Sequence, residues 1–191
     1  MFLLVAVLVG VLLSQRVGLA APVASALVAR GPVAEALRPQ LMPGLVGGLL
    51  CGALLLFVAR LAPPALSRLE GQFPLTAAAR VLYGGITEEL LVRWGLLTPL
   101  MWLFSRLTRH ARSPQLGVVA AAIIVSAVLF GAGHLPAASA LLHGLTPAVS
   151  AYIIGANTIF GLLAGWLFWR YGLESAMLAH VTAHVVLIAA G

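Results

Sequence analysis

The chain has 191 residues, of which 62% are hydrophobic and only 8% are charged, and its mean hydropathy is +1.08. Soluble domains carry roughly 25% charged residues, so this composition excludes an ordinary soluble protein and predicts one embedded in a membrane. The net charge of +6 does not indicate a nucleic-acid-binding protein, because the arginines separate apolar runs and form no clustered basic face. Cys51 is the only cysteine, which excludes an intrachain disulfide.

The apolar runs predict an all-α polytopic membrane protein with about six transmembrane helices. The run Met1–Leu13 is short but lacks the basic segment that precedes a signal peptide core, so we interpret it as a first spanning helix. Val17–Ala29 contains Pro22 and is too short to cross alone, which favours an interfacial or re-entrant segment. Five further runs approach the ~20 residues that a span needs: Leu41–Leu61, Gly84–Phe104, Gln115–His134, Pro147–Trp169 and Leu173–Ala190. Their continuity argues against a β-barrel.

The arginines predict the orientation of the chain in a membrane, for which we expect a bacterial inner membrane. Strict alternation of the helices assigns seven arginines to one side: Arg16, Arg30, Arg38, Arg106, Arg109, Arg112 and Arg170. It assigns three to the other: Arg60, Arg68 and Arg80. The positive-inside rule makes the first side cytoplasmic. We divide the single membrane domain into N-terminal helices over residues 1–75 and a helical core over residues 76–191.

Glycine spacing predicts where the helices pack. Gly44, Gly48 and Gly52 recur every fourth residue, and Gly161 and Gly165 repeat the spacing in another run. Small residues at this interval let helix backbones approach closely in lipid, where no hydrophobic driving force joins helices. The pattern indicates packing and carries no information about chemistry.

Ionisable side chains inside the apolar runs are few, and each is costly in a membrane, so each is a candidate functional residue. They are Glu88, Glu89, Arg93, His134, Glu174, His180 and His184. Glu174 is explained by its place at a helix start, where a carboxylate interacts favourably with the helix dipole. His110 and His143 lie between the runs, and we expect both to be solvated.

The first cluster is Glu88, Glu89 and Arg93. If a helix begins at Gly84, both acids lie in its first turn and the helix dipole accounts for them without function. Glu89 and Arg93 are four residues apart, in the favourable order for an ion pair on one helix face. Glu88 points about 100° away from Glu89 on an α-helix and therefore needs another partner.

The histidines form the second cluster. His180 and His184 are four residues apart on one face of a run that holds almost nothing else polar, which favours a water-filled cavity or a ligand at that face. His134 is the last residue of the run Gln115–His134, and a solitary histidine at such a place is usually an interfacial residue. The alternation of helices gives these residues and Glu88 compatible depths, so one outward-opening pocket can contain all four.

These residues, taken together, resemble a known family. Glu88-Glu89-Leu-Leu-Val-Arg93 matches an EExxxR motif, Phe130 to His134 matches FxxxH, and His180 to His184 occupies the position of HxxxN. In that order and spacing the chain resembles the CPBP family of glutamic-type intramembrane proteases, which includes the CAAX prenyl protease. The resemblance covers Gly84 to Ala190. The chain departs from the family at its last motif position, where His184 replaces the usual Asn.

The resemblance implies packed spanning helices around a cavity and hydrolysis of a peptide bond of a membrane-associated protein, without a cofactor. Carried over, Glu88 and His134 would activate the attacking water, while His180 and His184 would stabilise the oxyanion. Glu89 and Arg93 would be the structural pair. The expected partners are the lipid bilayer and a peptide or C-terminal protein tail, and no nucleic acid. Because the predicted pocket opens outward, an exported sorting tail or signal-like peptide is an alternative to a prenylated substrate.

Two alternatives stay open. In the first, the chain is a zinc protease: His180 and His184 have the spacing of zinc ligands, and His134 or Glu88 completes the set. No HExxH signature supports it, because Val181, Thr182 and Ala183 separate the histidines. In the second, the chain is a non-catalytic immunity or scaffold protein or a small transporter. The sequence contains no internal repeat of the kind that transporters show.

Overall fold

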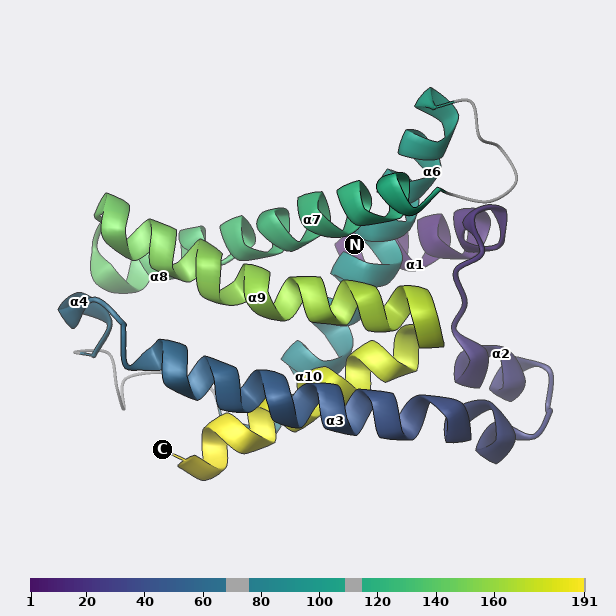
Figure 1. The fold of residues 1–191 in the computed structure, drawn as a ribbon, viewed down its shortest axis with the longest axis horizontal. Helices are drawn as coiled ribbons and strands as arrows, with labels where there is room; N and C mark the ends of the chain where they lie inside the picture. Colours follow the sequence, from purple (N-terminus) through teal and green to yellow (C-terminus); the bar gives the residue numbers. More distant parts are fainter. Residues whose placement is uncertain (68–75, 109–114, 191) are drawn as a thin grey trace.

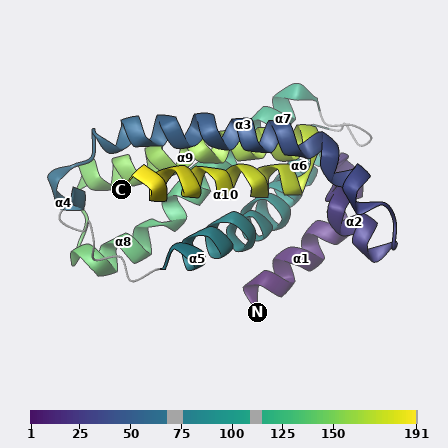
Figure 2. The same cartoon turned by 90° about the horizontal axis from the view of Figure 1, so that it is seen from below.

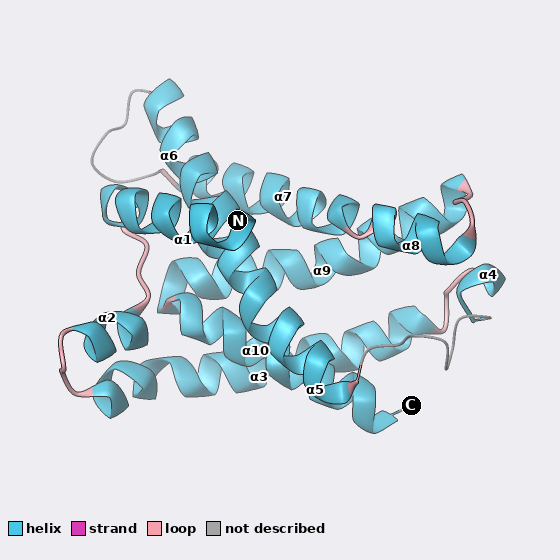
Figure 3. Ribbon diagram, turned by 180° about the vertical axis from the view of Figure 1, so that it is seen from behind, coloured by secondary structure: helices cyan, strands magenta, loops and turns pink. Residues whose placement is uncertain are grey.

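The computed structural model describes residues 1–67, 76–108 and 115–190. Its α-helices are α1 (Phe2–Leu13), α2 (Pro22–Val28), α3 (Val33–Ala59), α4 (Pro64–Ser67), α5 (Ala77–Ala79), α6 (Thr98–Leu107), α7 (Leu116–Gly133), α8 (Leu135–Leu142), α9 (Pro147–Tyr171) and α10 (Leu173–Ala190). A 3₁₀ turn, η1 (Ser14–Val17), follows α1, and two π-helical segments, η2 (Arg80–Glu88) and η3 (Leu90–Leu97), connect α5 to α6. Figure 3 shows that these helices are joined by short loops and that the described part of the chain has no strand.

The protein is a polytopic, all-α membrane protein, as predicted. Among the described residues, four helices are long and apolar enough to span: Val33–Ala59, Leu116–Leu142 with its bend at His134, Pro147–Tyr171 and Leu173–Ala190. The segments Phe2–Val17 and Pro22–Val28 form a pair bent by 109°, which adds a fifth span if the pair counts as one. The predicted run Val17–Ala29 therefore contributes the second arm of a broken span or re-entrant loop.

The predicted run Gly84–Phe104 lies within a longer helical stretch that extends from α5 through η2 and η3 to α6. Its helix begins at Ala77, where the Thr76 hydroxyl accepts a hydrogen bond from the Ala79 backbone N–H, so the expected start at Gly84 is wrong. Glu88 and Glu89 consequently lie well inside the helix. Interaction with the dipole of a first turn does not account for them.

Helix α10 is the centre of the arrangement (Figure 2). It lies between α3 on one side and the η2 segment on the other, and it also contacts α9, which packs on α7. The glycine prediction is confirmed at both packing lines. A Cβ on Gly48 would lie 2.5 Å from the Ala179 carbonyl oxygen of α10, and one on Gly161 would lie 2.8 Å from the Ala127 Cβ of α7. These glycines are what allow the helix backbones to come so close.

The described arginines are distributed unevenly between the two ends of the bundle. Five of them belong to elements at the end of the bundle that is on the right of Figure 1, namely η1, the end of α2, the start of α3, α6 and the end of α9: Arg16, Arg30, Arg38, Arg106 and Arg170. Arg60 and Arg80 lie toward the opposite end, and Arg68, Arg109 and Arg112 fall outside the described residues. The cytoplasmic location of the arginine-rich end stays a prediction of the positive-inside rule.

Candidate functional site

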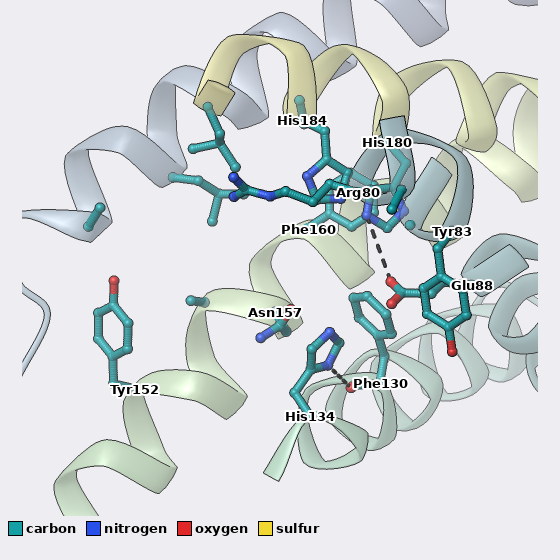
Figure 4. A pocket seen from close by; sticks show the side chains of 17 residues that line it. Arg80, Tyr83, Glu88, Phe130, His134, Tyr152, Asn157, Phe160, His180 and His184 are labelled. Carbon is teal, nitrogen blue, oxygen red and sulfur yellow. Dashed lines mark hydrogen bonds and ion pairs between the residues drawn. The ribbon is translucent and has the colours of Figure 1, made fainter. Parts of the chain in front are cut away.

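A cavity of about 420 Å³ opens away from the arginine-rich end. It lies among the last turns of α3, the first turns of α9, the η2 segment and the later turns of α10 (Figure 4). Most of its wall is apolar. The polar and charged side chains that line it are Arg80, Tyr83, Glu88, His134, Tyr152, Asn157, His180 and His184.

The cavity brings together Glu88, His134, His180 and His184. The first and last of these residues are 96 positions apart in the sequence. Glu88 ends η2, His134 follows the last residue of α7, and the histidine pair lies on one face of α10. The two imidazoles of α10 are stacked, with ring centroids 4.8 Å apart and an interplanar angle of 13°. His110 lies outside the described residues, and His143 is exposed at the end of α8, away from this site.

The His180 ring lies between two carboxylates, that of Glu88 at the end of η2 and that of Glu89, the residue that caps η2. Its Nδ1 is 2.8 Å from Glu89 Oε1, and its Nε2 is 4.0 Å from Glu88 Oε2. Glu88 thus has a partner other than Arg93, as the sequence analysis expected, but this partner, His180, also contacts Glu89. The two adjacent acids approach opposite nitrogens of one ring.

Glu89 is fully buried and binds two partners. Besides His180, its Oε2 lies 3.1 Å from Nε of Arg93, and neither side chain of this ion pair is exposed. The Arg93 guanidinium lies 5.0 Å from the centre of the Phe130 ring, which supplies a cation–π contact. Its two terminal nitrogens have no hydrogen-bond acceptor among the described residues. Among the described residues, Glu89 is therefore the main group that compensates the positive charge of Arg93.

The hydrogen bonds of the histidines define their free nitrogens. The Nδ1–H of His134 donates to the Phe130 carbonyl oxygen at 2.8 Å, which leaves Nε2 without a proton in the neutral ring. His180 donates from Nδ1 to Glu89. His184 Nδ1 is buried and has no partner among the described residues, although most buried polar side-chain atoms have one.

Aromatic side chains hold the His180 ring from two sides. The Phe160 ring centre is 4.1 Å from that of His180, and the Phe130 ring stands nearly perpendicular to it at 6.2 Å. Phe130 also contacts His134 edge-on at 4.8 Å. These contacts restrict the orientation of both imidazoles and keep their surroundings apolar.

The sequence analysis did not assign four polar residues of the cavity to the site: Arg80, Tyr83, Tyr152 and Asn157. Arg80 lies two turns before Glu88 in the same helix, and this spacing was a usable signal. Asn157 is an amide in the apolar run of α9, where the search considered only ionisable residues. Its Nδ2 donates to the Ile153 carbonyl oxygen at 2.8 Å. Tyr152 bonds the Val58 carbonyl oxygen at 3.3 Å, and no sequence signal pointed to it.

The set of ligands that a zinc protease requires is not assembled in the described part of the chain. No three His, Cys or Glu side chains there are close enough to hold a metal ion. His134, His180 and His184 line the same cavity, but the three do not come together as a set of metal ligands. Glu174 is also accounted for structurally, because its Oε1 accepts a hydrogen bond from the backbone N–H of Ala24 at 2.9 Å.

Comparison with protein families matches residues 70–186 to one family, type II CAAX prenyl endopeptidase Rce1-like. Most of the cavity lies within the matched range. Of the lining residues in η2, α7, α9 and α10, only Leu187 falls outside it. The corresponding searches of curated proteins and of solved structures found no match.

Proposed function

Because the chain belongs to the type II CAAX prenyl endopeptidase Rce1-like family, we propose that it is a glutamic-type intramembrane endopeptidase with Glu88 and His134 as the residues that activate water. The observation that carries the proposal is the meeting of these two side chains with His180 and His184 in one largely apolar cavity. A membrane protease is what membership of the family implies. The mechanism and the roles of individual residues are our proposal.

Glu88 is suited to accept a proton from water. Its carboxylate lines the cavity, is about one-fifth exposed and has no arginine within 4 Å in the described part of the chain. His134 offers an unprotonated Nε2, since its Nδ1–H is held by a backbone carbonyl. A water between them would lose one proton to this pair as its oxygen bonds to the carbonyl carbon. The same proton would then pass to the leaving amine as the C–N bond breaks.

The oxyanion would receive hydrogen bonds from the two histidines of α10. His180 can donate from Nε2 only as an imidazolium, since its Nδ1–H is committed to Glu89. His184 would donate through a ring nitrogen in place of the amide that an Asn supplies in the family pattern. Donors held rigid in a site poor in water stabilise a developing negative charge strongly. The two imidazoles stack on each other, and the tilted Phe160 ring contacts that of His180, which restricts their orientation.

The substrate we propose is a peptide or C-terminal tail of a membrane-associated protein. The apolar wall of the cavity favours extended, apolar segments, and Arg80 is a cation at its edge. We place the enzyme in a bacterial inner membrane, with the cavity facing away from the arginine-rich, cytoplasmic end. That orientation favours an exported sorting tail or signal-like peptide over a prenylated cytosolic substrate.

The test measures cleavage of a quenched fluorogenic peptide library by the purified protein in lipid nanodiscs. Glu88→Gln should lower kcat/KM by roughly 10²–10⁴-fold, the usual loss on removing a general base. Glu35→Gln is the matched control, since Glu35 is exposed in the first turn of α3 and lines neither described cavity. Equal activity of Glu88→Gln and wild type would refute the mechanism. Absence of any cleavage by a folded wild-type protein across the library would favour the non-catalytic alternative.

A further inference from the structure

A second cavity lies at the opposite end of the bundle from the first. It encloses about 160 Å³ between η1 and α6, and it is lined by Arg16, Val17, Trp102, Ser105 and Arg106. In Figure 1 this region is found where α1 and α6 approach each other, far from α4 and α8 at the end where the first cavity opens. None of its lining residues belongs to the candidate functional site.

Two cations share this small space without a carboxylate. No Asp or Glu of the described residues lies within 4 Å of Arg16 or Arg106. The Arg106 guanidinium lies 5.5 Å from the centre of the Trp102 ring, and this cation–π contact orients it. Two like charges beside one cavity repel each other, and an anion bound between them would relieve this repulsion. Guanidinium groups are the side chains best suited to bind phosphate oxygens in pairs.

The neutral groups of the wall agree with an anionic ligand. The indole Nε1–H of Trp102 is buried and has no acceptor among the described residues. Ser105 contributes no free donor, because its hydroxyl donates to the Met101 carbonyl oxygen at 2.7 Å. The dipole at the C-terminus of α6 accounts for Arg106 alone. It does not account for Arg16, which reaches the same cavity from another element.

We propose that this cavity binds a phosphate group at the membrane boundary. Its volume is well below the roughly 300–1,000 Å³ of pockets for drug-sized molecules, so it fits a single head group and no more. Leu12 and Leu107, four residues before Arg16 and next to Arg106, are exposed and apolar. They provide a surface for acyl chains next to the cations, which favours the phosphate of an anionic lipid over free phosphate. Basic pockets between transmembrane helices recognise lipid head groups in this way.

The experiment measures binding of three probes to the detergent-solubilised full chain: dioctanoyl phosphatidylglycerol, inorganic phosphate, and dioctanoylglycerol, which lacks the phosphate. We expect saturable binding of the phosphatidylglycerol, weaker binding of inorganic phosphate and none of dioctanoylglycerol. Arg16→Gln and Arg106→Gln should each weaken lipid binding by about tenfold or more, which is the loss of one charge-assisted contact. Both side chains are exposed, so neither change should prevent folding.

The matched control is Arg170→Gln. Arg170 lies at the same end of the bundle and 5.3 Å from the ring centre of its own tryptophan, Trp169, but it lines neither described cavity. Its substitution should leave binding unchanged. An equal loss in Arg170→Gln would refute the site, because the charge of the whole end would then explain binding. Binding that is insensitive to Arg16→Gln would also refute it. Binding of inorganic phosphate alone, lost in Arg16→Gln, would support a phosphate site and overturn the lipid as its source.

Discussion

The buried Glu89 gives the sharpest test of how the site is built, because it holds Arg93 and His180 at once. Glu89→Gln would keep an oxygen for the His180 Nδ1–H but remove the negative charge 3.1 Å from Arg93. The guanidinium would stay buried, with terminal nitrogens that already lack acceptors in the described part of the chain. We therefore expect Glu89→Gln to alter both stability and catalysis.

The magnitudes follow from the burial of the pair. Neither side chain of the ion pair is exposed, so solvent does not screen the charge left behind. Removing one partner of such a pair costs about 3–5 kcal/mol of unfolding free energy. Arg93→Met should cost less, because Glu89 keeps its hydrogen bond to His180. The double variant removes both charges and should recover about 1–3 kcal/mol relative to the sum of the single changes.

The assay has two readouts. Unfolding in mixed micelles with rising dodecyl sulfate gives the free energy for the wild type, the two single variants and the double variant. Turnover per folded molecule tests the second role of Glu89, which is to orient His180. Glu89→Gln should lower kcat, because an amide oxygen accepts the His180 Nδ1–H less strongly than a carboxylate does, whereas Arg93→Met should change kcat less. A coupling energy below about 0.5 kcal/mol would refute the ion pair as a stabilising unit. Equal kcat in Glu89→Gln and wild type would refute the positioning role.

Three further predictions concern single positions. His134→Ala should lower kcat by about 10²–10⁴-fold while the protein stays monodisperse in size-exclusion chromatography, and turnover within threefold of wild type would remove His134 from the mechanism. His184→Asn should keep much of the activity, because an amide can also donate to the oxyanion, and His184→Ala should lower it by roughly 10²–10³-fold. Turnover and bound metal are measured on the same samples with and without a chelator. Stoichiometric zinc that is lost in His184→Asn would instead support a zinc enzyme. Gly84→Ala should lower kcat by at least tenfold, because its Cβ would overlap His184 Nε2, whereas Gly117→Ala, whose Cβ meets nothing within 4 Å, should match wild type in cleavage and thermal unfolding assays.

The sequence was most informative where a short-range rule applies. The four-residue spacing of Glu89 and Arg93 predicts their ion pair, and the glycine repeat that includes Gly48 predicts close contact of α3 with another helix. Both rules depend only on residues of one helix face. The identity of the partner helix, α10, could not be predicted, because small residues permit close approach without selecting a partner.

The parts that could not be predicted depend on helix geometry and on contacts across the fold. An α-helical projection points the side chains of Glu88 and Glu89 in different directions. The π-helical segments that contain or flank these two residues cannot be predicted from composition. The contact of Phe160 with His180 is similar, since a phenylalanine in an apolar run predicts only a core residue. Asn157 was within reach of sequence reasoning, because an amide in a spanning helix needs a partner as much as a charge does.

The π-helical turns of η2 and η3 have a consequence for aligning and grafting this segment. Their hydrogen bonds close over one more residue than those of an α-helix, so the direction of each side chain depends on the number of residues in the segment as well as on their identity. Removing one residue between Arg80 and Glu88 would change the hydrogen-bonding pattern of the segment and the direction of its side chains. A one-residue gap in this segment is therefore not a neutral choice in an alignment. A chimaera that is meant to keep both carboxylates at His180 must carry the segment from Arg80 to Leu97 as one block of unchanged length.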